Sequence, residues 1–294
     1  MKSGFVSIIG RPNVGKSTLI NSLVEAKVAI VSSKVQTTRN NIQGIYNDDE
    51  AQIVFIDTPG IHKPINKLGK MLNKKAGSAF YDTDIILFLV DASSNLGQGD
   101  NYIINSLKNT EIPVILILNK IDRIAKEELL LKIDEYKDLY NFVEIIPVSA
   151  LKKDNVSYLV SIIKKYLKDN VRYYDADIIT SSSEKFLVSE YVREKILNLT
   201  EEEVPHSVTC LTTKFEEKKD IVNINVDIIV DRNSLKKIII GKDGAKLKQI
   251  GILARNDIEK LLEKKIYLEL YVKTIPRWRD KERLLRELGF RDNE

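Results

Sequence analysis

The chain has 294 residues, of which 43% are hydrophobic and 30% are charged, and its formal net charge is +4 at pH 7. This balance is typical of a soluble globular protein with one or two domains. A membrane-spanning protein is excluded, because no apolar run approaches the roughly 18 residues that a span needs. The mild positive charge does not by itself indicate a nucleic-acid partner.

Cysteine usage and the first residues indicate a reducing compartment. The only cysteine, Cys210, has no partner within the chain for a disulfide. The opening stretch MKSGFVSIIG lacks the long apolar core of a signal peptide. We therefore expect a cytoplasmic protein with no disulfide partner. No histidine adjoins Cys210 in its strand-like run, so we interpret it as a packed thiol.

Strand-like and helix-like segments alternate from the N-terminus to about residue 168. Near-continuous apolar runs with little alternation indicate strands that are buried on both faces of a parallel sheet. Such runs stand at residues 5–9, 52–57, 84–91, 112–120 and 143–150. Helix-like stretches lie between or after them, for example at residues 16–25, 125–140 and 155–169. The pattern predicts a doubly wound α/β domain over residues 1–171.

A polar stretch with three serines, residues 172–183, is interpreted as a linker in which Ser182 or Ser183 caps the next helix. We expect a second, smaller α+β domain over residues 184–294. Its predicted order is a helix, two strands, a mostly helical stretch and a last strand, at residues 184–200, 207–217, 220–231, 234–265 and 266–274. The second of these strands alternates apolar and polar residues, which predicts one solvated face.

A glycine-rich turn, GRPNVGKST, follows the first strand and opens a helix. It matches the phosphate-loop pattern, in which Gly10 and Gly15 let the backbone curl so that its N–H groups face an anion. The helix N-terminus adds partial positive charge. Lys16 is expected at the outer phosphates, and Ser17 is expected to offer its hydroxyl to Mg²⁺. The residues expected to contact the nucleotide are Gly10, Arg11, Pro12, Asn13, Val14, Gly15, Lys16, Ser17 and Thr18.

Three further motifs end buried strands at the edge where open parallel sheets bind ligands. DTPG supplies a carboxylate for Mg²⁺ and, at Gly60, an N–H for a terminal phosphate. NKID ends in a carboxylate that can accept both N–H bonds of guanine, which adenine cannot offer. The backbone N–H of Ala150 in SAL is expected to meet guanine O6. The residues are Asp57, Thr58, Pro59, Gly60, Asn119, Lys120, Ile121, Asp122, Ser149, Ala150 and Leu151. Asp48 and Asp91 lack this placement and are interpreted as solvated turn residues.

In this order the motifs resemble the P-loop GTPases of the translation-factor type. The resemblance implies GTP or GDP as ligand and a switch threonine between the phosphate loop and DTPG. QTTRN, residues 36–40, fills that place, with Thr38 as the expected Mg²⁺ ligand and Thr37 as the alternative. The expected metal ligands are therefore Ser17, Thr38 and Asp57, and the expected catalytic residues are Lys16, Thr38 and Gly60.

Slow hydrolysis by the isolated protein is expected, because Ile61 stands where many such GTPases have a water-orienting glutamine. His62 is not assigned as a base, and Arg39 is expected to face solvent. The resemblance also implies a role for Asn13 of the phosphate loop. In GTPases with a hydrophobic residue in place of the glutamine, the matching asparagine can help to coordinate K⁺.

A second glycine turn, GKDG, lies between two helix-like stretches of the second domain. A Gly-x-x-Gly turn in this setting is typical of KH domains, where it lets a nucleic-acid backbone approach closely. Residues 232–248 hold six basic side chains and one acidic side chain, which is the charge pattern of a phosphate-binding surface. The expected RNA-binding residues are Gly241, Lys242, Asp243, Gly244, Lys236, Lys237 and Lys246. The run Ile238–Ile240 is interpreted as core, and Trp278 as an anchor for the C-terminal tail rather than a stacking platform.

Over nearly its full length the chain resembles the Era family, P-loop GTPases with a C-terminal KH domain. Besides the motifs already quoted, the tail WRDKERLLRELGF carries this resemblance. It implies binding to the 3′ end of small-subunit (16S) ribosomal RNA, a role in assembly of the small ribosomal subunit, and partial association with the inner face of the cytoplasmic membrane. We expect a monomer. The alternative is a GTPase whose second domain docks a protein or another RNA.

Overall fold

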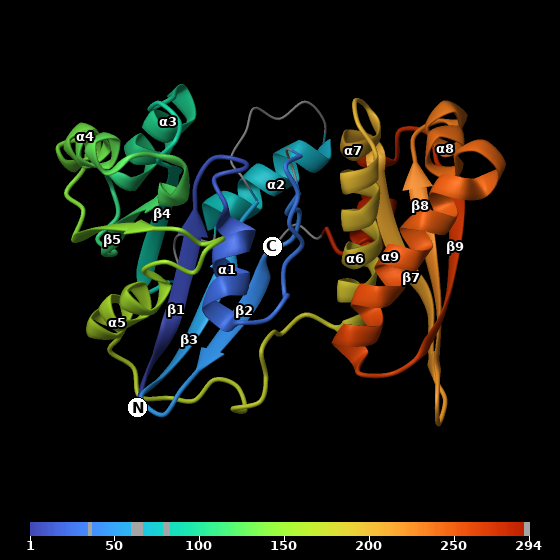
Figure 1. The fold of residues 1–294 in the computed structure, drawn as a ribbon, viewed down its shortest axis with the longest axis horizontal. Coiled ribbons are helices and arrows are strands. Elements are labelled where there is room, and N and C mark those ends of the chain that lie inside the picture. Colours follow the sequence, from blue (N-terminus) through green and yellow to red (C-terminus); the bar gives the residue numbers. More distant parts are fainter. Residues whose placement is uncertain (35–36, 60–66, 79–82, 291–294) are drawn as a thin grey trace. The chain divides into compact units, whose positions relative to one another are not determined.

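The computed structural model describes residues 1–34, 37–59, 67–78 and 83–290, with the backbone alone for residues 73–78. The chain forms two compact units (Figure 1). The first unit comprises Met1–Ala29, Thr38–Ile65 and Gly69–Ser181, and the second comprises Ile30–Thr37, Asn66–Leu68 and Ser182–Glu294. Each unit has a sheet of its own.

The first unit is built on a six-stranded sheet with the strand order β2-β3-β1-β4-β5-β6. All neighbours are parallel except β2 and β3, which pair antiparallel at one edge. The strands are β1 (Lys2–Ile9), β2 (Ile42–Asn47), β3 (Ala51–Asp57), β4 (Ile85–Asp91), β5 (Val114–Asn119) and β6 (Glu144–Val148). Five of these six strands coincide with the apolar runs of the sequence.

Helices cover both faces of this sheet. They are α1 (Lys16–Val24), α2 (Lys67–Ser78), α3 (Gln98–Leu107), α4 (Lys126–Lys137) and α5 (Val156–Tyr166). Alternate residues of β4 enter two separate cores: Leu87 packs with α1 and α5, and Phe88 packs with α3 and α4. Burial on both faces explains why the strands read as unbroken apolar runs. The predicted doubly wound α/β class is confirmed.

The second unit has a three-stranded sheet in the order β7-β8-β9, with β7 antiparallel and β9 parallel to β8. The strands are β7 (Val208–Glu217), β8 (Val222–Val230) and β9 (Ile266–Thr274). The helices are α6 (Glu184–Leu199), α7 (Val204–Ser207), α8 (Asn233–Ile240), α9 (Ala245–Leu262) and α10 (Glu282–Glu287). Apolar residues of α6, α8 and α9 share one core with alternate residues of β8, so the predicted α+β class is confirmed.

Two acidic side chains in this fold are held by hydrogen bonds or ion pairs within the protein. In the turn between β2 and β3, Asp48 accepts hydrogen bonds from Tyr46, Lys164 and the backbone N–H groups of Glu50 and Ala51. Burial alone would raise the pKa of Asp48, but these bonds lower it to about 2. Asp227 on the polar face of β8 is 6% exposed and pairs with Lys273 at 2.5 Å. Asp48 is thus a partly exposed turn residue, as interpreted, and its carboxylate is in addition held by bonds within the protein.

The C-terminal tail is fixed by Trp278, which begins a short 3₁₀ turn, Trp278–Asp280. Its side chain is fully buried, and its indole Nε1 donates a hydrogen bond of 2.9 Å to the carbonyl oxygen of Ser207. A buried indole with a satisfied N–H packs as an anchor and has no free face on which a base could stack. This agrees with the interpretation of Trp278 as the tail anchor.

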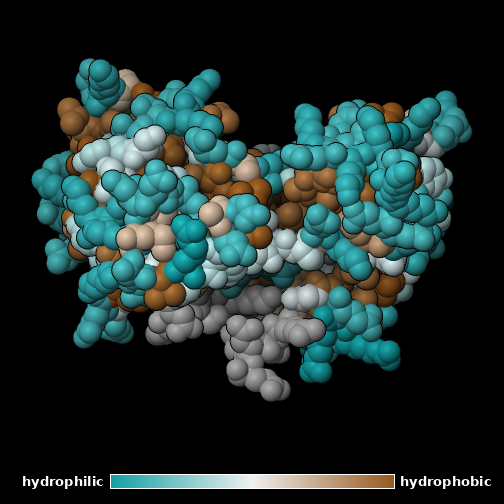
Figure 2. Space-filling view, turned by 90° about the horizontal axis from the view of Figure 1, so that it is seen from below, coloured by the Kyte–Doolittle hydropathy of each residue, from teal (hydrophilic) through white to brown (hydrophobic). Residues whose placement is uncertain are grey.

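The surface that Figure 2 displays carries mostly hydrophilic side chains over both units, with hydrophobic residues interspersed. This distribution is ordinary, because folded proteins always leave part of their apolar surface exposed. Over the ranges that the structure describes, every helix is too short or too polar to cross a membrane.

Candidate functional site

The phosphate-loop segment joins the end of β1 to the first turn of α1. A side chain at Gly10 would place its Cβ 2.3 Å from the carbonyl oxygen of Leu89, and one at Gly15 would place it 2.3 Å from the amide nitrogen of Asn119. Gly15 also has a left-handed backbone, with φ of 104°. Only glycine fits at these two positions, because close approach and backbone conformation both exclude a Cβ. The backbone of the loop therefore leads directly into the N-terminus of α1, and a helix N-terminus is a favourable binding site for an anion.

Lys16 is held inside this loop. Its Nζ donates hydrogen bonds of 2.9 Å to the carbonyl oxygens of Gly10 and of Arg11. The side chain is buried, and burial lowers the pKa of Lys16 to about 8 although Asp57 acts in the opposite direction. Among the described residues, the hydrogen-bond partners of this buried ammonium are carbonyl oxygens. An anion beside it would stabilise its charged form.

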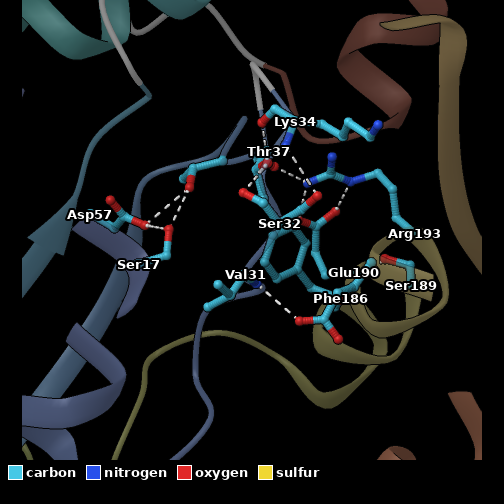
Figure 3. Close-up of polar contacts among 12 residues, drawn as sticks. Ser17, Val31, Ser32, Lys34, Thr37, Asp57, Phe186, Ser189, Glu190 and Arg193 are labelled. Carbon is cyan, nitrogen blue, oxygen red and sulfur yellow. Dashed lines mark hydrogen bonds and ion pairs between the residues drawn. The ribbon is translucent and has the colours of Figure 1, made fainter. Parts of the chain in front are cut away.

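The side chains of Ser17 and Asp57 meet at the carboxyl end of β3 (Figure 3), and the hydroxyl of Thr38 joins them. The Ser17 hydroxyl donates to Oδ2 of Asp57 at 2.7 Å, and the Thr38 hydroxyl donates to the same oxygen at 3.1 Å. The two hydroxyl oxygens lie 2.9 Å apart. Thr37, the alternative to Thr38, instead donates its hydroxyl to the carbonyl oxygen of Lys34. The residues brought together are thus the three that the sequence proposed as metal ligands.

The chemistry of this cluster suits a hard divalent cation. Asp57 is fully buried, and its other carboxylate oxygen, Oδ1, has no hydrogen-bond partner within the described part of the chain. Burial raises the pKa of Asp57, while Lys16, Ser17 and Thr38 lower it. Hydroxyl and carboxylate oxygens are the donors that Mg²⁺ prefers, and a cation or its water would satisfy the unpaired oxygen. The residues present therefore fit magnesium.

Asn119 ties the phosphate loop to the loop after β6. Its side-chain amide donates to the carbonyl oxygen of Val14 at 2.8 Å, and its Oδ1 accepts the backbone N–H of Ala150 at 3.0 Å. The side chain is 2% exposed. Sequence reasoning grouped Asn119 with the base contacts and missed this bracing role. In this structure the Ala150 N–H that was expected at guanine O6 is engaged by Asn119.

Lys120 and Asp91 form a second brace at the same edge. Lys120 Nζ lies 2.6 Å from Oδ2 of Asp91 and also donates to the carbonyl oxygen of Asn13 at 2.8 Å. Burial would raise the pKa of Asp91, but the hydrogen bond from Lys120 lowers it below its usual range. Interpreting Asp91 as a solvated turn residue is therefore wrong. Its position at the end of β4, next to β5, was the signal that could have identified it.

The carboxylate expected to read the base, Asp122, lies in a short 3₁₀ turn, Ile121–Arg123, and is exposed. Its Oδ1 accepts the Ser149 hydroxyl at 2.5 Å, so NKID and SAL meet as the motif order predicts. Thr58 donates its hydroxyl to the carbonyl oxygen of Ile8 and is buried. Gly60, Ile61 and His62 lie outside the described residues. Arg39 is 1% exposed, so the expectation that it faces solvent is wrong.

The GKDG turn of the second unit presents its backbone openly. Gly241, Asp243 and Gly244 all have positive φ, at 73°, 51° and 77°. A Cβ at Gly241 would lie 2.8 Å from Cβ of Lys246, whereas one at Gly244 would meet nothing within 4 Å. Gly241 is thus required by close packing, and Gly244 leaves space where a ligand backbone can approach.

The side chains around this turn are exposed or half-buried and mostly basic. Lys237, Lys242 and Asp243 are exposed, and Lys236 and Lys246 are half-buried. Ile238 is 44% exposed, so interpreting the whole run Ile238–Ile240 as core is wrong for its first residue. The buried residues of α8 are Leu235 and Ile239, four positions apart, and Ile238 falls off that face. An exposed apolar residue beside a basic turn suits a ligand with both charge and flat apolar surface.

The chain matches two family descriptions and two closely similar structures. Residues 5–120 match the family described as 50S ribosome-binding GTPase, and residues 203–279 match the family described as KH domain. A variant of Era from Aquifex aeolicus bound to GDP and AlF4⁻ is 42% identical to the chain, with a TM-score of 0.95. Era in complex with MgGDPNP and nucleotides 1506–1542 of 16S ribosomal RNA has the same identity and TM-score. Each match covers 99% of both chains.

The depressed pKa of Lys16, about 8, predicts proton uptake when a nucleotide binds. Near pH 8.5 this side chain is partly neutral in the free protein, and phosphate oxygens beside it raise its pKa again. Binding near pH 8.5 should therefore take up a fraction of a proton, and affinity should fall as the pH rises above about 8.

Calorimetry in two buffers of different ionisation enthalpy measures this uptake. The same titration near pH 7 is the control, because there Lys16 is mostly protonated in both states. Binding without proton uptake near pH 8.5 would show that the ammonium is not desolvated as described.

Proposed function

The chain belongs to the Era family of GTPases, and from this premise we propose that it is a GTP-dependent switch of ribosome assembly. It binds GTP through the first unit, hydrolyses it to GDP and phosphate, and binds small-subunit ribosomal RNA through the second. The observation that carries the proposal is the oxygen cluster of Ser17, Thr38 and Asp57 beside the buried Lys16. Such a cluster at the carboxyl edge of a parallel sheet suits a magnesium-bound phosphate.

Each part of the nucleotide has proposed partners. Backbone N–H groups from Gly10 to Thr18 surround the phosphates, with the Lys16 ammonium among them. Ser17, Thr38 and Asp57 hold magnesium, which when bound neutralises part of the phosphate charge. The carboxylate of Asp122 accepts the two guanine N–H groups. The backbone N–H of Gly60 is proposed at the terminal phosphate, and the remaining base-side residues are Asn119, Lys120, Ile121, Ser149, Ala150 and Leu151.

Hydrolysis by the isolated protein is proposed to be slow, because Ile61 offers no polar group to orient water. Positioning and electrostatics then supply the acceleration. Asn13 of the phosphate loop is proposed to bind a potassium ion that assists hydrolysis. It has a left-handed backbone with φ of 65° and an exposed position in the phosphate loop. Its amide oxygen is of the donor type that alkali cations accept.

The second unit is proposed as the RNA-binding domain, with Gly241, Lys242, Asp243 and Gly244 at the nucleic-acid backbone. Lys236, Lys237 and Lys246 add positive charge around this turn. We assign the GTPase domain to residues 1–171, the linker to residues 172–183 and the KH domain to residues 184–294. The cytoplasmic location, the association with the membrane and the monomeric state stay predictions.

A competing function, in which the second unit docks a protein, has a weaker basis. A protein-docking face needs no open glycine backbone and no excess of lysine. The positive φ values at Gly241 and Gly244 and the free space at Gly244 favour a ligand whose own backbone comes close. The alternative predicts that charge reversal at Lys242 leaves RNA affinity unchanged.

Replacing sodium with potassium is expected to raise the rate of GTP hydrolysis several-fold, because K⁺ held by Asn13 would add positive charge beside the phosphates. Turnover is measured in KCl and in NaCl at equal ionic strength. Asn13→Gly, which accepts the same positive φ and lacks the amide oxygen, should remove the difference between the two salts. Equal rates in both salts for the unmodified protein would eliminate the role of potassium.

Lys242→Asp is expected to weaken binding of 16S ribosomal RNA from its 3′ region by about tenfold or more, because it reverses charge at the nucleic-acid backbone. GTP turnover should stay unchanged. Lys219→Asp, at an exposed lysine in the turn between β7 and β8, makes the same charge change elsewhere in the unit and should have a much smaller effect. Filter binding at fixed salt measures both. Equal losses for the two variants would argue for nonspecific attraction.

A further inference from the structure

The segment Ile30–Thr37, between α1 and β2 in the sequence, belongs structurally to the second unit. Ile30 is 1% exposed and lies in the core that α6, α8 and α9 form with the second sheet. The backbone N–H of Val31 donates a hydrogen bond of 2.9 Å to Oε1 of Glu194 on α6 (Figure 3). One apolar and one polar contact thus hold the start of this segment to the second unit.

Arg193 of α6 holds the other end of the segment. Its guanidinium makes a forked pair with Glu190, with Nε 2.7 Å from Oε1 and Nη2 2.6 Å from Oε2. The same Nη2 donates a hydrogen bond to the carbonyl oxygen of Thr37 (Figure 3). Both side chains are buried, at 1% and 9% exposed. The guanidinium is therefore fixed by Glu190 and aimed at a single backbone carbonyl.

That carbonyl is one peptide bond away from the hydroxyl-bearing residue of the nucleotide site. The atoms from Cα of Thr37 to Cα of Thr38 share one plane, so fixing the Thr37 carbonyl also fixes the N–H and the Cα direction of Thr38. Within the first unit the Thr38 hydroxyl contacts Ser17 and Asp57. Thr37 is thus held by a contact within the second unit, and Thr38 is held by contacts within the first unit.

Core packing alone does not account for a charged pair at this position. Burying an arginine and a glutamate costs desolvation that apolar residues of similar size would avoid. The forked pair with Glu190 orients the guanidinium, and Nη2 also donates to the Thr37 carbonyl, while Nη1 has no hydrogen-bond partner within the described residues. Residues 67–68 also belong to the second unit, but the ion pair between Lys67 and Glu282 lies on the surface. Exposed pairs of that kind contribute little, whereas the Arg193 contact is shielded from water.

We propose that Arg193 is a positioning residue for the GTP-bound state: by holding the Thr37 carbonyl it aligns Thr38 for magnesium and the terminal phosphate. This inference rests on the proposed function. Because GDP lacks the terminal phosphate, the alignment of Thr38 favours GTP over GDP. Arg193 is therefore also a determinant of nucleotide selectivity, although it lies in the second unit.

The test compares nucleotide affinities of the full-length protein and its variants in the presence of Mg²⁺. Arg193→Gln should raise the Kd for GDPNP about three- to tenfold, the size expected for the net contribution of one ordinary hydrogen bond, and leave the Kd for GDP within about twofold. Arg193→Lys retains one charged donor and should restore part of the loss. Arg255→Gln is the matched control, because this exposed arginine of α9 pairs with Glu259 in the same unit, and it should change neither affinity.

A double variant separates the loss of the Arg193 hydrogen bond from a general loss of folding stability. Arg193→Gln leaves Glu190 buried without its partner, which can destabilise the second unit. Glu190→Gln combined with Arg193→Met removes both charges at similar volume, and it should show the same selective loss with a melting temperature close to that of the unmodified protein. Hydrogen exchange in the GDP-bound state adds an independent readout, since the Thr38 amide should exchange faster in this double variant.

Two outcomes would overturn the inference, and they are distinguishable. Equal Kd changes for GDPNP and GDP, or none, in the stably folded double variant would show that Arg193 is only structural. If the unmodified protein bound neither guanine nucleotide, the proposed function itself would fail, and this inference with it.

Discussion

The contact on which the nucleotide site depends is the shared hydrogen bonding of Ser17 and Thr38 to one buried oxygen of Asp57. A carboxylate at the end of a central strand is costly to bury, and two hydroxyls together with the nearby Lys16 offset part of that cost. The arrangement gathers residues from the phosphate loop, the segment before β2 and the end of β3. The other carboxylate oxygen of Asp57 has no hydrogen-bond partner among the described residues, and a cation or its water would satisfy it.

Around this contact the sheet edge is braced by side chains that join neighbouring loops to one another. Asn119 ties the phosphate loop to the loop after β6, and Lys120 ties it to Asp91. These braces fix main-chain groups of the phosphate loop, which lowers the amount of ordering that nucleotide binding requires. The NKID motif therefore has two physical tasks in our proposal, since Asn119 and Lys120 shape the phosphate loop while Asp122, which accepts the Ser149 hydroxyl, is proposed to read the base.

Much of this organisation could be predicted from the sequence, because the signals are local. Unbroken apolar runs identified five strands of the first sheet, since burial on both faces leaves no polar positions. β2, an edge strand with the mixed sequence IQGIYN, gives no such run. The bracing by Asn119 could not be predicted, because it joins residues more than thirty positions apart through tertiary structure. Nor could the membership of Ile30–Thr37 in the second unit, since neighbours in sequence are expected to share a domain.

We propose that the phosphate loop and the buried oxygen cluster of Ser17, Thr38 and Asp57 bind guanine nucleotides with magnesium, and that Asp122 selects the base. The most direct measurement is the affinity of the full-length protein for GTP and for ATP in the same Mg²⁺ buffer. We predict that GTP binds at least about a hundredfold more tightly, because adenine would leave the Asp122 carboxylate without its two N–H donors. Equal affinity for the two nucleotides would contradict the account.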